Sequence, residues 1–168
     1  GEVQFGNEKV TPEEMTFFDP CMGSGHILVY AFDVLMEIYR ECGYVNRDAA
    51  QAIIENNLFG LDIDNRAYQL AYFAVMMKAR SYDRRFLTRK IEPNVSAIVE
   101  TNIIKQFSCD GITHNKEQNK VGEYLVNAYK HAKEIGCLLS VENREYNEFK
   151  EYLNTCNASG QITMDSDY

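Results

Sequence analysis

The chain has 168 residues, of which 45% are hydrophobic and 25% charged, ordinary values for one globular domain with a buried core. No apolar run approaches the roughly 20 residues that span a bilayer, and no basic segment followed by an apolar one opens the chain, which argues against a membrane anchor or signal peptide. We therefore expect a cytoplasmic location. The net charge of −8 argues against strong nucleic-acid binding by this chain alone, because phosphate contacts require Lys and Arg. Because residue 1 is Gly rather than Met, we expect a piece of a longer protein.

The cysteines and one basic stretch each have a simple interpretation. The five cysteines, at positions 21, 42, 109, 137 and 156, form no Cys-x-x-Cys pair, which favours reduced thiols over a zinc cluster or a disulfide framework, and we expect no metal site. Six cations gather in a short stretch: Lys78, Arg80, Arg84, Arg85, Arg89 and Lys90. A solvated helix end, where cations complement the helix dipole, is favoured there over a phosphate-contacting patch.

The first hundred residues predict alternating strands and helices. Residues 15–18 are apolar and β-favouring and predict a buried strand that ends at Asp19. Apolar residues at helical spacing follow from residue 26 until Gly43, and a second helix is expected over 47–55, broken at Asn56 and Asn57. Residues 58–63 predict a second buried strand, Asp64 or Asn65 caps a helix that reaches Met77, and residues 95–99 predict a third strand. This order implies a parallel α/β sheet with flanking helices.

The remaining residues have a different pattern. We expect a loop over 110–119, one helix over 121–135 and another over 145–156, whereas residues 157–168 show no strong pattern. The predicted organisation is therefore a Rossmann-like α/β portion over 1–99, which holds the ligand loop described next, and a helix-rich segment over 100–168, an insert or extension of the same domain.

The turn after the first strand carries the chemistry. Its sequence, Asp19-Pro20-Cys21-Met22-Gly23-Ser24-Gly25-His26, joins a strand that ends in an acid to a helix start through a glycine-rich loop. The glycines let the backbone approach a ligand, and the helix start offers free amide groups. A phosphate-binding P-loop requires Gly-Lys-Ser/Thr, but His26 follows Gly25. A dinucleotide loop favours a small residue where Leu28 stands, and its acid follows after about 20 residues, sooner than Asp62 does.

S-Adenosylmethionine fits this pattern better, because it carries an ammonium and a sulfonium but no phosphate. Asp19 lies beside the loop, where a carboxylate complements a cation. The ribose requires an acceptor at the end of the next strand, and Asp62 supplies a carboxylate there. Ile63 would then flank the adenine ring. Each feature alone has a simpler interpretation, since Gly-x-Gly is common in turns and Asp62 could cap the next helix, although Asp64 suits that role better.

The residues from Asp19 to Leu28 resemble the first motif of the N6-adenine DNA methyltransferases, and Gly60-Leu61-Asp62-Ile63-Asp64 with Arg66-Ala67 resembles their second motif. With Phe32-Asp33 and Lys78-Ala79-Arg80, the sequence is most similar to the large adenine methyltransferases of bacterial phage-exclusion systems, with type IIG restriction-modification enzymes as close relatives. The resemblance covers about residues 15–98 and implies a partial Rossmann-like fold. It implies that the methyl donor contacts the cofactor-binding residues Asp19, Pro20, Cys21, Gly23, Ser24, Gly25, Asp62 and Ile63.

The catalytic motif of that family, Asn-Pro-Pro followed by an aromatic residue, is not in this sequence. The three prolines stand at positions 12, 20 and 93, so no two are adjacent. We therefore expect a fragment, inactive alone, whose parent contacts DNA through other parts and whose exposed sheet edge permits self-association. Two alternatives remain open, a methyltransferase for another substrate and a stand-alone module that binds S-adenosylmethionine; a nicotinamide-binding domain is less favoured.

Overall fold

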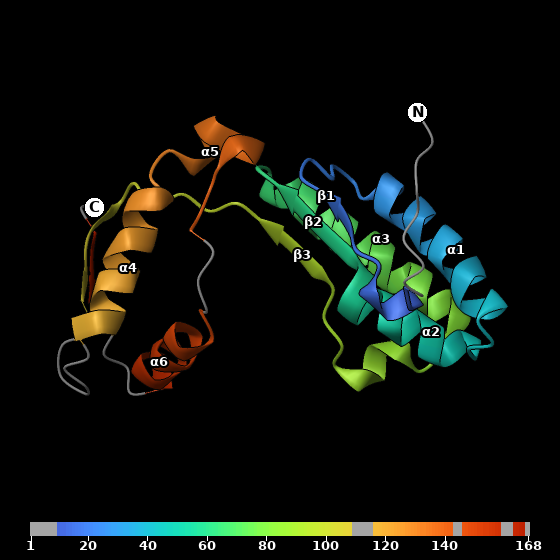
Figure 1. Ribbon diagram of the computed structural model, residues 1–168. Helices are drawn as coiled ribbons and strands as arrows, with labels where there is room; N and C mark the ends of the chain where they lie inside the picture. The colour runs from blue at the N-terminus through green and yellow to red at the C-terminus, as the bar shows by residue number, and fades with distance from the viewer. Residues whose placement is uncertain (1–9, 109–115, 143–145, 159–162, 167–168) are drawn as a thin grey trace, which may run out of the picture. The chain divides into compact units, whose positions relative to one another are not determined.

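The computed structural model describes residues 10–108, 116–142, 146–158 and 163–166 (Figure 1). It divides into two units, residues 1–97 and residues 98–168, which are described one at a time. We expected the α/β portion to end at residue 99. That the second segment belongs to the same domain stays a prediction.

The first unit is built on a three-stranded parallel sheet with the order β1-β2-β3 (Figure 1). The strands are β1 (Phe17–Asp19), β2 (Leu58–Asp62) and β3 (Asn94–Ala97). β2 is central, with Phe17 opposite Leu58 on one side and Gly60 opposite Val95 on the other. The predicted parallel α/β class is therefore confirmed.

The strand order places the connecting helices on one face of the sheet. Parallel strands joined through a helix cross over in the right-handed sense, and two successive crossovers in one direction bring both helices to the same side. The helices are α1 (His26–Glu41), α2 (Asn46–Ala52) and α3 (Asn65–Tyr82), and α1 and α3 lie side by side over the sheet (Figure 1). A shorter helical turn precedes each strand. These turns are η1 (Pro12–Glu14) before β1, the π-helical η2 (Ile53–Asn57) before β2 and η3 (Phe86–Arg89) before β3.

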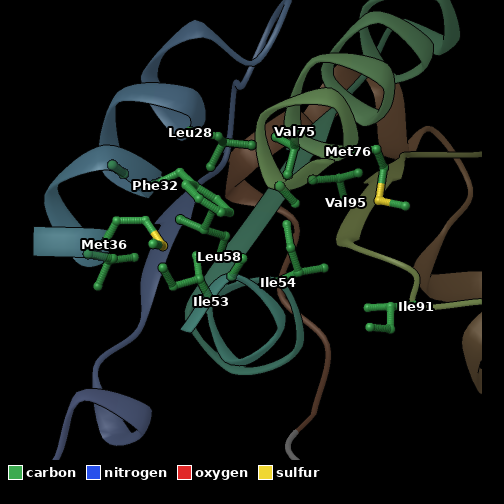
Figure 2. Packing of buried hydrophobic residues seen from close by; sticks show 14 of the residues in the cluster. Leu28, Phe32, Met36, Ile53, Ile54, Leu58, Val75, Met76, Ile91 and Val95 are labelled. Atoms are coloured by element: carbon green, nitrogen blue, oxygen red, sulfur yellow. The ribbon is translucent and has the colours of Figure 1, made fainter. Parts of the chain in front are cut away.

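The core of this unit lies between the sheet and the helices. Figure 2 shows the side chains of α1 meeting those of η2, β2 and α3 in one apolar layer. The labelled members come from five elements and one loop: Leu28, Phe32, Met36, Ile53, Ile54, Leu58, Val75, Met76, Ile91 and Val95. Burial of a large aliphatic or aromatic side chain contributes about 1.5–3 kcal/mol, so this layer is the main source of stability in the unit.

One prediction about β1 is wrong, because the strand is not buried. Phe17 and Phe18 are both exposed, Phe18 to 54%, and Met15 just before them is exposed as well. β1 is an edge strand of the sheet, and Phe18 shares a shallow hollow with Phe59 and Leu61 of β2. The apolar composition therefore indicated a strand correctly, but it did not indicate that the strand is at an edge.

A buried asparagine holds the segment before β1 against the core. Asn57 is fully buried, and its Nδ2 donates to the carbonyl oxygens of Pro12 (2.7 Å) and Met15 (2.6 Å). Its Oδ1 accepts a hydrogen bond of 2.9 Å from the hydroxyl of Tyr39, which is also buried. The expected break at Asn57 is therefore the π-helical turn that aims this side chain inward.

A polar cluster joins α1 to α3. Lys78 Nζ lies 2.6 Å from Asp33 Oδ2, and the Tyr82 hydroxyl donates to Asp33 Oδ1 at 2.9 Å. The Tyr82 ring stacks on Phe32, and the Arg40 guanidinium lies over the Tyr82 ring, 5.5 Å from its centroid. The two helix segments that carried part of the family resemblance thus contact each other through Asp33 and Lys78.

The second unit combines an antiparallel pair of strands with helices. β4 (Ile104–Ser108) pairs with β5 (Thr163–Ser166), and α4 (Lys116–Ala128) and α6 (Asn147–Ala158) pack with them. Among the residues described in this unit, four buried side chains form a small core: Phe107, Val126, Phe149 and Tyr152.

The helix expected over residues 121–135 is interrupted. α4 ends at Ala128, and a short helix α5 (Ala132–Ile135) begins after His131, whose φ is +58°; a 3-10 turn, η4 (Gly136–Leu138), follows. The Asn102 side chain accepts from the His131 amide at 2.9 Å and stabilises the break. Neither β4 nor β5 was predicted. Most of the loop expected over 110–119 lies outside the described residues, and 116–119 are helical instead. No helix in the described part of the chain combines the length and apolar composition that crossing a membrane requires.

Candidate functional site

The carboxyl ends of the parallel strands meet at one edge of the sheet, and two acids stand there. Asp19 ends β1 and lies opposite Gly60, whereas Asp62 ends β2 two residues farther along. Ligands of open α/β sheets bind in the crevice outside these strand ends. The predicted site residues therefore lie at the edge of the sheet where a ligand is expected.

The glycine turn between β1 and α1 has a left-handed backbone at two positions. The φ angles are +54° at Gly23 and +79° at Gly25, values that side-chain-bearing residues adopt at a cost of about 1–2 kcal/mol. The Gly25 amide donates to the Met22 carbonyl at 2.8 Å, which closes the turn, and the Gly25 carbonyl accepts from Val29 at 2.9 Å as α1 begins. This geometry requires glycine and sets the start of α1.

Gly25 also lies against α3. A Cβ at Gly25 would stand 2.9 Å from both the Cα and the Cβ of Ala71, which is closer than carbon atoms pack. The absence of a side chain at Gly25 and the small one at Ala71 therefore bring the turn and α3 into direct backbone contact.

Met22 anchors the glycine turn to β2. Its side chain is 1% exposed and lies beside Gly60, where an added Cβ would come within 2.6 Å of the Met22 sulfur. Its amide donates to the Leu61 carbonyl of β2 at 3.0 Å. We did not predict a role for Met22 or Gly60. Gly60 was the available signal in the sequence, because glycine in a strand interior often marks a position that another segment approaches closely.

Asp62 connects the two predicted parts of the site. Its Oδ2 accepts from the Gly23 amide at 2.8 Å, and its Oδ1 accepts from the Asp64 amide at 2.8 Å. The motif at residues 19–25 and the motif at residues 60–64 are therefore joined by a hydrogen bond between residues 39 positions apart. Asp64, in turn, caps α3 by accepting from the Arg66 amide at 2.8 Å, which confirms it as the helix cap.

Asp19 has one satisfied and one unsatisfied oxygen among the described residues. Its Oδ1 accepts from the Cys21 amide at 3.1 Å, whereas the enclosed Oδ2 has no hydrogen-bond donor there. A buried carboxylate oxygen without a donor is unfavourable by about 1–3 kcal/mol or more. Asp19 thus has one oxygen that accepts no hydrogen bond from the described residues and could accept a donor or face a cation.

The other predicted site residues are accessible. Pro20, Cys21 and Ser24 are exposed on the turn, and a Cβ at Gly23 would meet no atom within 4 Å. Ile63, 48% exposed, follows Asp62 and offers an apolar surface beside it. The turn and the β2 end therefore present open backbone, a carboxylate and an apolar side chain on neighbouring strands.

The basic stretch from Lys78 to Lys90 is partly used inside the fold. Lys78 pairs with Asp33, and Arg89 pairs with Asp83 at 2.8 Å and donates to Gln51 at 2.9 Å. Arg80 lies in the last turn of α3, as the helix-end interpretation expects.

Comparison with known proteins gives related sequences, although no family model matches the chain. The chain is 45% identical over 137 residues, 81% of its length, to the adenine-specific methyltransferase PglX of Lacticaseibacillus casei (strain Zhang). It is 50% identical over 94 residues, 56% of its length, to the adenine-specific methyltransferase BrxX of Escherichia coli O9:H4 (strain HS). A putative type II restriction enzyme and methyltransferase of Methanocaldococcus jannaschii is 35% identical over 65 residues. The chain spans 11%, 8% and 6% of the lengths of these three relatives.

The parallel sheet, the glycine turn and the acid-terminated neighbouring strands define part of a Rossmann-like methyltransferase fold. Within that class, the chain is similar to one segment of proteins named adenine-specific methyltransferases. The predicted family resemblance is thereby confirmed.

Proposed function

We propose that this chain binds S-adenosylmethionine as one segment of an enzyme that methylates N6 of adenine in DNA. The observation that supports the proposal is the hydrogen bond from the Gly23 amide to Asp62, because it brings both motifs to the carboxyl edge of the sheet. The names of the relatives at 45% and 50% identity support the adenine substrate.

The residues present suit this donor by charge and shape. The ligand carries an ammonium group, and Asp19 holds an oxygen without a donor among the described residues. The Asp62 oxygens each accept one backbone amide, and a carboxylate oxygen has a second lone pair for a ribose hydroxyl. Exposed Ile63 provides apolar contact for the adenine ring, and Pro20, Cys21, Ser24 and Gly25 complete the turn around the methionyl end.

When bound, S-adenosylmethionine would supply an electrophilic methyl group, and this chain would hold and orient the donor. The sequence has no Asn-Pro-Pro-aromatic motif to position an adenine amine. We propose that other segments of a longer protein supply that motif and contact DNA, and that this chain alone does not transfer methyl groups. The net charge of −8 supports DNA contact through other parts.

The binding step is tested by calorimetric titration of the chain with S-adenosylmethionine and, separately, with NAD. We expect saturable binding of the methyl donor, and Asp62→Ala should weaken it by about 1.5–3 kcal/mol, the contribution of a hydrogen bond to a charged group. Asp64→Ala is the matched control, because it removes the neighbouring carboxylate that caps α3 and leaves Asp62 in place. Binding of NAD without binding of S-adenosylmethionine would refute the proposal.

The substrate is tested with a longer chain that contains this segment. We expect transfer of a labelled methyl group to N6 of adenine in DNA. At a donor concentration that saturates the unmodified protein but not the variant, Asp62→Ala should lose this activity. Methyl transfer to RNA, protein or cytosine in place of adenine would favour the alternative, a methyltransferase for another substrate.

A further inference from the structure

The Asp62 carboxylate is engaged by backbone amides of the protein itself. Both of its oxygens accept backbone amides at 2.8 Å, one from Gly23 across the site and one from Asp64 in its own turn. Distances of 2.7–2.9 Å are typical of hydrogen bonds strengthened by a charge. Asp62 is therefore part of the architecture of the turn, in addition to being a candidate ligand residue.

Met22 and Gly25 lie close against other elements, whereas the side-chain position of Gly23 faces open space. Met22 is buried beside Gly60, and Gly25 lies against Ala71. In contrast, no atom stands within 4 Å of where a Gly23 Cβ would be, although the φ of Gly23 is +54°. Glycine has more accessible conformations than any other residue, so a left-handed glycine whose Cβ position is open benefits from a further restraint. The hydrogen bond to Asp62 provides one.

We propose that Asp62 is a positioning residue for the glycine turn, so that one carboxylate shapes the methionyl end of the donor site while binding its ribose end. This inference rests on the proposed function for the identity of the donor, but not for the restraint on Gly23. Each Asp62 oxygen keeps a lone pair after accepting its amide, so ribose binding and the restraint are compatible. Loss of Asp62 therefore disturbs both ends of the site.

The restraint is tested by amide hydrogen exchange in the full 168-residue chain without ligand. In Asp62→Ala, exchange of the Gly23 amide should accelerate about tenfold or more, the fold-change equivalent to the loss of a charge-assisted hydrogen bond. Exchange at Leu28 and Leu58, in the neighbouring helix and strand, should be unchanged, which separates a local effect from unfolding. Asp62→Asn keeps one carbonyl acceptor and should show a smaller acceleration. Asp64→Ala, as control, should accelerate the Arg66 amide and not that of Gly23.

The coupling is tested with S-adenosylhomocysteine and its 2′,3′-dideoxy analogue, which lacks the ribose hydroxyls. If Asp62 only bound the ribose, Asp62→Ala would bind the dideoxy analogue as the unmodified chain does. We expect Asp62→Ala to bind this analogue about fivefold or more weakly, because the turn is no longer held. Unchanged Gly23 exchange or equal affinity for the analogue would overturn the inference. If the unmodified chain bound neither nucleoside, the proposed function would fail, while the exchange result would still decide the restraint.

Discussion

Replacement of Gly25 by alanine is the sharpest test of how the turn is built. Two penalties act together at this position. The φ of +79° disfavours any L-residue by about 1–2 kcal/mol, and the new Cβ would stand 2.9 Å from the Cα and Cβ of Ala71. Overpacking of this kind is unfavourable by about 1–3 kcal/mol, and backbone atoms of α3 cannot rotate away. We expect Gly25→Ala to lower the free energy of unfolding by about 2–5 kcal/mol.

Gly43→Ala is the matched control for this prediction. Gly43 follows α1 with a φ of +86°, but a Cβ there would meet no atom within 4 Å. Gly43→Ala therefore carries the conformational penalty alone, about 1–2 kcal/mol. The difference between the two variants isolates the contact with Ala71.

Urea unfolding followed by circular dichroism measures both variants, with exchange of β2 amides assigning the transition to the first unit. For an m-value of about 2 kcal/mol per molar urea, Gly25→Ala should lower the midpoint by about 1–2.5 M. Adding Ala71→Gly should recover part of the loss, since it removes the Cβ overlap but leaves the Cα overlap and weakens α3 by about 1 kcal/mol. If Gly25→Ala were no more destabilising than Gly43→Ala, the close approach of the turn to α3 would not constrain the fold.

Four further outcomes are expected. Asn57→Leu should lower the free energy of unfolding by about 2–4 kcal/mol, because it leaves buried polar partners unpaired; a change below 0.5 kcal/mol would contradict this. Burial and the nearby Glu13 carboxylate raise the pKa of Tyr39 to about 12. The contribution of the protonated Tyr39 to the free energy of unfolding is therefore complete below pH 10 and is lost as the pH rises through 12. Tyr39→Phe should therefore flatten the decline of stability over pH 10–12 by up to about 2–3 kcal/mol, and an unchanged alkaline slope would count against it. Asp64→Ala should lower the free energy of unfolding by about 1 kcal/mol through loss of the α3 cap, which equal denaturation midpoints would disprove. Size-exclusion chromatography should show concentration-dependent self-association through the exposed edge, reduced by Phe18→Ser; a clean monomer at high concentration would oppose it.

Local features of the first unit could be predicted from the sequence because neighbouring residues determine them. The periodic apolar positions of α1, the glycines of the turn and the cap at Asp64 each depend on residues within one or two helical turns. The exposure of Phe18 does not. Whether a short apolar strand is central or at an edge depends on which strands pair beside it, and composition is the same in both cases.

The second unit was harder to predict for the same reason. β4 and β5 pair across a large sequence separation, so neither has a nearby partner to mark it. The break before α5 occurs at His131, which has the positive φ that is uncommon for residues other than glycine, and Asn102 stabilises it from another segment. Helical periodicity alone therefore extended one helix through a point where a tertiary contact ends it.

The candidate site combines a locally determined turn with tertiary contacts, and these contacts determine how variants of the site should differ. Gly25 is held by packing against α3, whereas Gly23 is held by the hydrogen bond that its amide donates to Asp62 of β2, 39 residues away in the sequence. Packing defects in a core contact reduce global stability, whereas loss of one partly exposed hydrogen bond mainly increases local opening. Substitution of Gly25 should therefore be detected mainly in the free energy of unfolding, and substitution of Asp62 mainly in local exchange and ligand affinity. The sequence motif marks Gly23 and Gly25 as parts of one loop. Only the tertiary contacts distinguish Gly25, which supports the fold, from Gly23, which shapes the site.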